Sequence, residues 1–546
     1  MKKNTGNIII WSLFYSFVFV FLIYNSFSYL DPDLGWHLKV GQQIAAERAV
    51  PGLENYNYTL SGKSWVDHEW LANLIIFLIY DQFGYLVLSA LFALLIILIL
   101  IILNRQIKKI CRQSTENSAW LTIIIIILEI LGVIAVAPHI GVRIQEVGLL
   151  FLLLLLLVIQ KFESAKNWKT LLWLLPILYF WSCLHGSFLI SLFILGFWIF
   201  IKIIERLIAA RFGCRRFYFL NFENKTTWLD IKNFAWLASA AIASTFFTPY
   251  GFKLYSFLAD YTDNFYAEHI VEWLPVFTFP FSYAQMFYLS TAIAVVLIYC
   301  LNFHYSRKKN IAFTPSINLW QLGLFFVFLF LAFKSRRHFP LFFIVSLPII
   351  VQIIFNEFQS AKINFNLFRG FLIKFYLLSA ILLAAAGLIL KTNFTNEPFL
   401  NKNFCQTYPC AAINFLKNNG QYSNLRLFND YNWGGFMIWT WPGKKIFTDG
   451  RLPQYPYNNH TLLEEYYAFF DEKKTEERLD QHNIELVLLK IEKPRKIKRW
   501  EQIVFGIKDR ETKNNLSNYL SGAKTWRLVY TDDISQIYVK NNNANQ

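Results

Sequence analysis

The sequence predicts a polytopic α-helical membrane protein with about eleven transmembrane helices and a C-terminal extracytoplasmic α/β domain. Of its 546 residues, 55% are hydrophobic and only 16% are charged. Apolar runs of about twenty residues recur from residue 8 to residue 390, and a run of that length crosses a hydrocarbon core of roughly 30 Å. Such runs must be helical, because unpaired backbone groups find no water in lipid. Beyond residue 391 the composition becomes that of a soluble domain.

The apolar runs give the expected order of the membrane helices. They lie at residues 8–29, 84–103, 119–137, 144–160, 170–184, 187–204, 233–248, 284–302, 316–333, 339–355 and 371–390. Residues 70–80 are apolar but short, so we expect an interfacial or re-entrant helix there. The first run follows Lys2 and Lys3 without a small-residue cleavage site, which indicates a retained helix with the N-terminus inside.

Basic residues alternate between the loops as the positive-inside rule requires. The segments at 105–112, 161–169, 205–232 and 307–309 are rich in Lys and Arg and are therefore expected inside. The net charge of +16 follows from this topology, so we expect no nucleic-acid partner. The expected location is the plasma (inner) membrane, with the N-terminus cytoplasmic and the C-terminal domain extracytoplasmic.

Two domains follow from this reading: a transmembrane domain at 1–390 and an α/β domain at 391–546. In the second domain the pattern predicts helices at 408–418 and 461–482 and strands at 425–428, 435–439, 445–447, 485–489 and 534–540. Cys405 and Cys410 are either a disulfide, if the domain is extracytoplasmic, or two free thiols.

The topology brings the polar motifs to one side of the membrane. The long polar loop from Asp31 to Trp70 lies outside, together with Pro-His at 138–139, Leu-His-Gly at 184–186, Thr-Pro-Tyr-Gly at 248–251, the segment at 268–273 and Lys-Ser-Arg-Arg-His at 334–338. Such convergence is what an active site at the outer membrane surface needs. We therefore interpret 31–70 as a catalytic loop.

Asp31 and Asp33 begin this loop at the end of the first helix. One carboxylate can accept a proton from an acceptor hydroxyl or amine while the other orients it or holds a metal. We expect Asp33 to be the base and Asp31 to assist it. The alternative is a solvated helix end with no chemical role.

Asp67, His68 and Glu69 form a second acidic motif, and Glu272 is a further acid in an outer loop. These residues are expected to bind a metal or the acceptor. Acidic groups before a helix also suit its positive dipole end, which is the alternative for the first three. If the reaction uses a divalent metal such as Mg²⁺ or Mn²⁺, Asp31, Asp33, Asp67 and Glu69 are the expected ligands.

Arg336, Arg337 and His338 are cations on the outer side, where the rule predicts few. Guanidinium groups bind phosphate bidentately, so these residues and Arg143 are expected to hold a lipid phosphate. The alternative is that they snorkel toward lipid headgroups. Further outer-face candidates are His37, His185, Asp430, Asp449 and Arg451, and His139 and His269 also fall on that side.

The motifs DPDLGWHL, WVDHEWL, CLHGS, TPYG and NWGG followed by DGR resemble a group of uncharacterised bacterial multi-pass proteins of the GT-C type. More distantly, the chain is similar to other members of the GT-C superfamily of membrane glycosyltransferases: protein O-mannosyltransferases, the aminoarabinose transferase of lipid A and oligosaccharyltransferases. The resemblance implies that Asp33 or Asp31 is the first-loop catalytic acid. Asp67 and Glu69 match the second acidic motif loosely, because they precede the second helix instead of following the third.

The expected function is thus transfer of a sugar from a polyprenyl-phosphate-linked donor to a lipid, glycan or protein acceptor at the outer face. The partners are this donor and membrane lipids. Two other classes stay open: a transporter or flippase for a lipid-linked saccharide, for which Glu129 is the most conspicuous intramembrane acid, and a non-catalytic envelope assembly protein.

Overall fold

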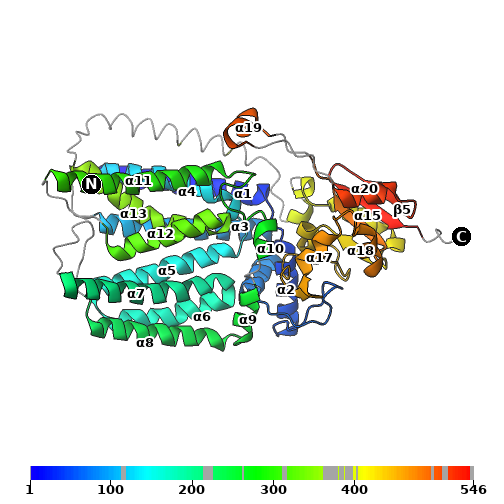
Figure 1. The fold of residues 1–546 in the computed structure, drawn as a ribbon, viewed down its shortest axis with the longest axis horizontal. Coiled ribbons are helices and arrows are strands. Elements are labelled where there is room, and N and C mark those ends of the chain that lie inside the picture. The colour runs from blue at the N-terminus through cyan, green and yellow to red at the C-terminus, as the bar shows by residue number, and fades with distance from the viewer. Residues whose placement is uncertain are drawn as a thin grey trace.

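The computed structural model describes residues 2–111, 118–212, 226–260, 264–309, 317–360, 379, 387, 397–400, 404–493, 497–506 and 514–541. A bundle of long helices occupies one end of the molecule and a smaller α/β region occupies the other (Figure 1). The N-terminus lies at the end of the bundle that is farther from the α/β region.

The bundle contains the apolar helices that the sequence predicts. They are α1 (Lys2–Ser28), α3 (Trp70–Ile110), α4 (Ser118–Val136), α5 (Gln145–Ala165), α6 (Leu174–Leu184), α7 (Leu189–Phe212), α8 (Trp228–Ser244), α11 (Tyr283–Lys308), α12 (Leu319–Lys334) and α13 (Phe339–Ser360). Within the described residues, seven helices are long and apolar enough to cross a membrane. The predicted number of eleven is therefore not confirmed, and the predicted helix at 371–390 lies outside the described residues.

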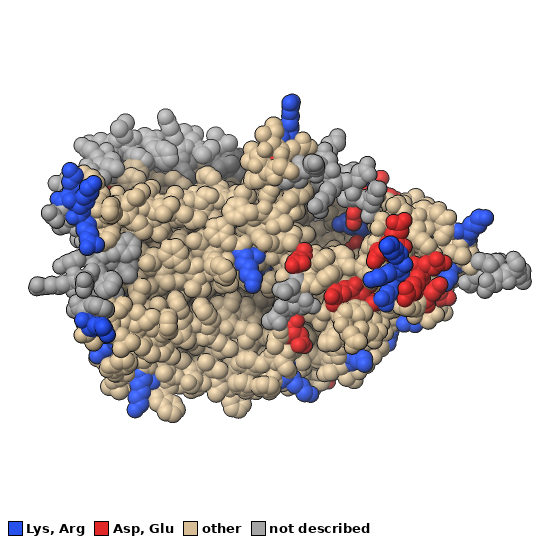
Figure 2. Space-filling model, in the orientation of Figure 1, with Lys and Arg blue, Asp and Glu red and all other residues tan. Residues whose placement is uncertain are grey.

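Surface charge follows the long axis of the bundle. On the face drawn in Figure 2, basic side chains lie at the end near the N-terminus, and acidic and basic side chains together lie near and on the α/β region. The surface between them is mostly uncharged. An uncharged belt with charged ends agrees with a chain that crosses a bilayer.

Helix α3 contains a break at Gly84. The residue has φ 75° and ψ −179°, a backbone conformation that glycine adopts without a Cβ penalty. The break separates 70–80, predicted as an interfacial or re-entrant helix, from the long apolar part of the helix. The short segment is thus the first part of α3.

The first polar loop holds a helix that the sequence analysis missed, α2 (Leu34–Glu47). Leu34 and Leu38, and likewise Val40 and Ile44, are buried and lie four residues apart, so the apolar signal was present within a segment read as a loop. The helix lies between the bundle and the α/β region (Figure 1). It joins the two parts of the molecule.

The α/β region is built on a four-stranded sheet. The strands β1 (Leu427–Asn429), β4 (Leu486–Lys490), β6 (Ser535–Lys540) and β5 (Trp526–Thr531) follow in this spatial order. Strands β1 and β4 are parallel, and the other neighbours are antiparallel. Strands β2 (Pro456–Tyr457) and β3 (His460–Thr461) form a separate pair. The predicted strands at 425–428, 485–489 and 534–540 are confirmed.

The helices of this region are short. They are α15 (Cys410–Asn418), α16 (Gly434–Thr440), α17 (Leu462–Ala468), α18 (Thr475–Gln481), α19 (Arg499–Phe505) and α20 (Asn515–Gly522). The predicted strand at 435–439 is wrong, because this segment is helix α16. The predicted strand at 445–447 is also wrong: Ile446 makes a single bridge to Asn57 of the first loop instead of joining the sheet.

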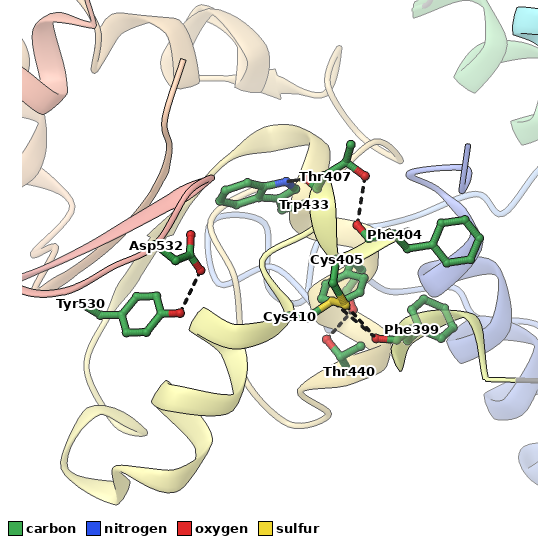
Figure 3. The surroundings of a disulfide bond; sticks show 10 residues. Phe399, Phe404, Cys405, Thr407, Cys410, Trp433, Thr440, Tyr530 and Asp532 are labelled. Atoms are coloured by element: carbon green, nitrogen blue, oxygen red, sulfur yellow. Dashed lines mark hydrogen bonds between the residues drawn. A yellow bond between two sulfur atoms is a disulfide. The ribbon is translucent and has the colours of Figure 1, made fainter. Parts of the chain in front are cut away.

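Cys405 and Cys410 form a disulfide, one of the two alternatives open from the sequence (Figure 3). The bond closes a short loop in front of α15. Within this loop, Tyr408 donates a hydrogen bond to the Leu30 carbonyl at 3.0 Å, at the base of the first polar loop. Trp433 donates to the Thr407 carbonyl at 3.0 Å and holds α16 to the same loop. The disulfide loop therefore fastens the α/β region next to Asp31.

Candidate active site

The turn between α1 and α2 presents two carboxylates in different surroundings. The Asp33 backbone N–H donates to Asp31 Oδ1 at 2.8 Å, which fixes the turn. The Asp33 carboxylate accepts a hydrogen bond from Trp36 Nε1 at 2.9 Å, one turn along α2. Asp31 instead faces Arg143, whose Nε lies 2.9 Å from Asp31 Oδ2. The negative charge of Asp31 is thus balanced by a cation.

Arg143 begins a chain of alternating charges. Its Nη1 lies 2.5 Å from Glu272 Oε1, and Glu272 Oε2 lies 3.6 Å from Arg337 Nη1. The two arginines hold the pKa of Glu272 at about 2 although burial alone would raise it. Glu272, predicted as an acid in an outer loop, is therefore an anion held between Arg143 and Arg337.

The second acidic motif is buried beside the first. Asn73 Nδ2 donates to both oxygens of Asp67, at 3.0 and 2.8 Å, and Asn73 Oδ1 lies 2.6 Å from His37 Nδ1. Because the amide nitrogen serves Asp67, the amide oxygen must accept from His37, which assigns the ring proton to Nδ1. Glu69 Oε1 lies 3.5 Å from His68 Nε2 and 3.4 Å from His185 Nε2.

These surroundings divide the carboxylates by their proton affinity. Burial, and then the charge of Asp31, raises the pKa of Asp33 to about 7. Burial likewise raises the pKa of Asp67 to about 6. Burial opposes the ionisation of Glu69, but His68 outweighs it and holds the pKa of Glu69 well below its usual range. Asp33 is therefore the carboxylate with a pKa close to neutrality, the value suited to a general base at physiological pH.

Three cavities meet at these residues. The first, the interface cavity, has a volume of about 460 Å³ and is lined by Asp31, Asp33 and Glu272 and by residues of the α/β region. The second, the acidic pocket, has about 70 Å³ and is lined by Asp33, Asp67, Glu69 and other residues of the first loop.

The third, the apolar cavity, has about 260 Å³ and lies between helices of the bundle. Leu149, Leu189, Ile190, Leu258 and Leu341 line it, and its polar edge carries histidines: His68, His139, His185 and His338. Gln145, Tyr266 and Arg337 line all three cavities. The Arg337 guanidinium therefore lies where the apolar cavity of the bundle meets the acidic pocket and the interface cavity.

The backbone of the α/β region contacts the first loop, including Asp33, at glycine positions. A Cβ added at Gly450 would collide with Asp33 Oδ1, and one added at Gly35 of α2 would collide with the Gly435 carbonyl. A Cβ at Gly435 would meet the Pro32 carbonyl in the same way. These positions accept no side chain, so they let the backbone of the α/β region come within contact of the first loop.

Asp449 and Arg451 flank Gly450 and form a buried ion-pair network with Glu54 of the first loop. Arg451 Nη1 lies 2.7 Å from Glu54 Oε2, and Arg451 Nη2 lies 2.7 Å from Asp449 Oδ2. All three side chains are almost completely buried. Both residues were predicted as outer-face site candidates. The structure shows that they lock the α/β region to the first loop, although Arg451 also borders the acidic pocket.

Arg336 is placed differently from its neighbour. Its guanidinium donates to the backbone carbonyls of Thr278 and Pro275, and its backbone N–H donates to the Leu274 carbonyl. It lines none of the three cavities. Arg336 thus fastens the loop that carries Glu272, and the prediction that both arginines bind one phosphate does not agree with this placement. His338 lines the apolar cavity.

The remaining predicted residues divide between cavities. His37 and His68 line the acidic pocket, His185 the apolar cavity, and Asp430 and His269 the interface cavity. Burial lowers the pKa of His185 to about 4, which favours its neutral form.

Sequence reasoning missed Gln145, Tyr266 and Asn73. The signal for Gln145 was its place two residues after Arg143, and that for Tyr266 was its place two residues before the outer segment at 268–273. Asn73 gave no signal, because apolar residues surround it in the chain.

The predicted metal ligands do not form a metal site as they stand. Within the described part of the chain, no group of three or more His, Cys, Asp or Glu side chains is arranged to hold an ion. Asp31 is engaged by Arg143, Asp67 by Asn73, and Glu69 by two histidines. We therefore derive no step through a metal.

No protein-family model and no curated protein matches the sequence. Among solved structures, the chain is similar to the oligosaccharyltransferase of Archaeoglobus fulgidus tethered to an acceptor peptide. That likeness has a TM-score of 0.49 and 11% identity over 88% of this chain and 68% of that one. A second structure, the A. fulgidus oligosaccharyltransferase AglB with an inhibitory peptide and a dolichol-phosphate, gives a TM-score of 0.49 and 12% identity over 89% and 69%.

Proposed function

We propose that this protein is a membrane glycosyltransferase that moves a sugar from a polyprenyl-phosphate-linked donor to an acceptor at the outer face of the membrane. The observation that carries the proposal is the position of Arg337. One cation borders an apolar cavity between membrane helices, a pocket of buried carboxylates and an open cavity under the α/β region.

The three cavities match the three parts of such a reaction. The apolar cavity takes the first isoprene units of the carrier, since four leucines and one isoleucine line it between the helices. Arg337 then meets the phosphate at the end of that chain, where a guanidinium can donate two hydrogen bonds. The sugar lies beyond the phosphate, near the acidic pocket, and the acceptor enters through the interface cavity.

The chemical step needs a base and a stabilised leaving group. Asp33 accepts the proton of the acceptor hydroxyl, and the acceptor oxygen forms a bond to the anomeric carbon of the sugar. The bond between that carbon and the phosphate oxygen breaks, and its electron pair stays on the phosphate. Arg337 stabilises the charge that develops there. Glu69, an anion beside His68 and His185, can stabilise positive charge on the sugar ring.

The arrangement of charge and cysteines supports an outer location for the site. The N-terminus lies at one end of the bundle, near a group of basic side chains, and the α/β region lies at the other (Figures 1 and 2). The site lies at the second end, because Asp33 contacts Gly450 of the α/β region. By the positive-inside rule, the second end is extracytoplasmic. The Cys405–Cys410 disulfide agrees, because disulfides persist in oxidising compartments.

Transport was the main alternative, and it rested on Glu129. This side chain is fully buried within the bundle and accepts a hydrogen bond from Asn104 Nδ2 at 3.3 Å. It lines none of the three cavities described above. No observation in the described residues connects Glu129 to a path for a saccharide, so transfer is the better supported function.

Exchange of Asp33 for asparagine tests the proposal, because it keeps the shape of the side chain and removes the base. We expect Asp33→Asn to slow transfer from a polyprenyl-phosphate hexose by roughly 10²–10⁴-fold. Release of free polyprenyl phosphate by protein in liposomes measures the rate. Asp81→Asn, at an exposed position of α3, is the matched control and should keep the wild-type rate. Transfer by Asp33→Asn at the wild-type rate would remove Asp33 from the mechanism.

A further inference from the structure

We propose that the acceptor in the interface cavity is a neutral or amino saccharide, bound by the aromatic wall of the α/β region with a hydroxyl turned toward Asp33. The use of that hydroxyl rests on the transfer proposed above. The binding site itself rests on the shape and lining of the cavity, which can be tested without any transfer.

The cavity has two unlike walls. Asp31, Asp33, Arg143, Glu272 and Arg337 form the wall on the side of the bundle. The opposite wall comes from the α/β region and is aromatic, with Tyr431, Tyr466, Tyr467 and Phe470. A ligand between the walls therefore meets the carboxylates with one edge and aromatic rings with another.

The aromatic wall is a connected band of rings. The Tyr431 and Tyr466 ring centroids lie 6.1 Å apart, and those of Tyr466 and Tyr467 lie 5.4 Å apart. Tyr467 continues the band to His269 of α10 (Asn264–His269), at 4.8 Å. Tyrosine supplies a large apolar face and a polar edge. Sugar rings have the complementary surface, with C–H bonds on their faces and hydroxyls around their edges.

The polar groups between the rings also suit hydroxyls. Asp430, Asn432, Lys490, Glu492 and Asn514 line the same cavity. The amides offer both donors and acceptors, the carboxylates accept, and the lysine donates. A polyhydroxylated ring can use all of these groups, whereas an apolar lipid chain can use none.

The formal charge of the lining disfavours strongly anionic acceptors. Five acidic residues line the interface cavity, namely Asp31, Asp33, Glu272, Asp430 and Glu492, against three basic ones, Arg143, Arg337 and Lys490. Arg143 is already paired with two of the acids. A phosphorylated or carboxylated sugar would meet net negative charge in this cavity, while a neutral or amino sugar would not.

The size of the cavity is compatible with a short saccharide. Its volume of about 460 Å³ lies within the range of roughly 300–1,000 Å³ that is usual for small-ligand sites. The site therefore holds a terminal segment of a glycan, with the rest extending toward solvent.

Saturation-transfer NMR on the full chain in detergent tests the proposal. The probes are two neutral disaccharides, cellobiose and N,N′-diacetylchitobiose, the amino disaccharide chitobiose, and an uncharged hexapeptide. We expect at least one saccharide to bind, and Tyr467→Ala to weaken it by about tenfold or more. Tyr467→Phe keeps the ring and should keep the binding. Tyr519→Ala, a half-buried tyrosine of α20 outside the cavity, is the matched control and should bind as the wild type.

Two results would overturn the proposal. One is that no saccharide binds, whether or not the hexapeptide does. The other is saccharide binding that Tyr467→Ala leaves unchanged. Failure of the transferase proposal looks different: the wild type would release no polyprenyl phosphate, or Asp33→Asn would release it at the wild-type rate, while a saccharide still binds. If only the saccharide inference fails, Asp33→Asn still loses transfer while no saccharide binds.

Discussion

Asp31 and Asp33 show how two identical residues acquire different properties within one turn. Arg143 lies 2.9 Å from Asp31 and forms an ion pair with it, whereas Asp33 has an indole donor and a half-buried position between two cavities. The sequence predicted the pair and the preference for Asp33. It could not predict Arg143 as the partner of Asp31, because the two residues are far apart in the chain and their contact depends on how the helix ends meet.

The pKa of Asp33 predicts the pH dependence of transfer. A base must be deprotonated, and burial and Asp31 raise the pKa of Asp33 to about 7. Below that pH the carboxyl is protonated and cannot accept the acceptor proton, so the rate should rise with pH and level off above about 7. The rate of polyprenyl phosphate release at saturating donor measures this, and donor binding across the same range is the control. A rate that stays constant from about pH 5.5 to pH 8.5 would contradict the assignment.

The contact of Gly450 with Asp33 predicts a sharp steric effect. In Gly450→Ala the new methyl group would collide with Asp33 Oδ1, so the carboxylate must move away from the acceptor. We expect transfer to fall by roughly 10²-fold, the usual effect of a displacement of about 1 Å in an active site. In Gly522→Ala the methyl group meets open space, and this variant should keep the rate. Equal rates for both variants would show that Asp33 does not need its present position.

At the scale of elements, the sequence was most informative where the length of an apolar run alone decides the structure. The apolar runs gave the bundle helices, because lipid leaves no other backbone conformation. The errors lie where the first loop meets the α/β region. Residues 435–439 have strand-like composition, yet they form α16, because Gly434 and Gly435 must pack their backbone against Asp449 and Pro32. Helix α2 was missed for the same reason: its buried face is covered by the bundle and by a region distant in sequence.

The Glu54–Arg451–Asp449 network predicts how firmly these elements are joined. Removal of one partner leaves uncompensated charge in a site that is almost completely buried. We expect Arg451→Leu to lower the free energy of unfolding of the α/β region by about 3–5 kcal/mol, as for other buried ion pairs. The melting temperature of the detergent-solubilised protein measures the effect. The exposed Arg527→Leu is the control, and a melting temperature of Arg451→Leu equal to that of the control would argue against a locking role.

At the scale of the whole molecule, the candidate site depends on parts that no single segment contains. The first loop supplies the carboxylates, and the α/β region supplies Gly450. Arg143 comes from the loop after α4, and Glu272 comes from the loop after α10. Arg337 lies just before α13. The sequence predicted that these segments converge, because topology places their helix ends on one side. The sequence could not predict the shape of the cavities, because that shape depends on how side chains such as Tyr266 pack.

Binding of polyprenyl phosphate to the purified protein tests the central claim most directly. We compare the wild type with Arg337→Gln, and use Arg307→Gln, an exposed arginine at the end of α11, as the control. Because Arg337 is the cation shared by all three cavities, its loss should weaken binding by about tenfold or more, and Arg307→Gln should bind as the wild type. Equal affinity of Arg337→Gln and the wild type would contradict a lipid phosphate at this position.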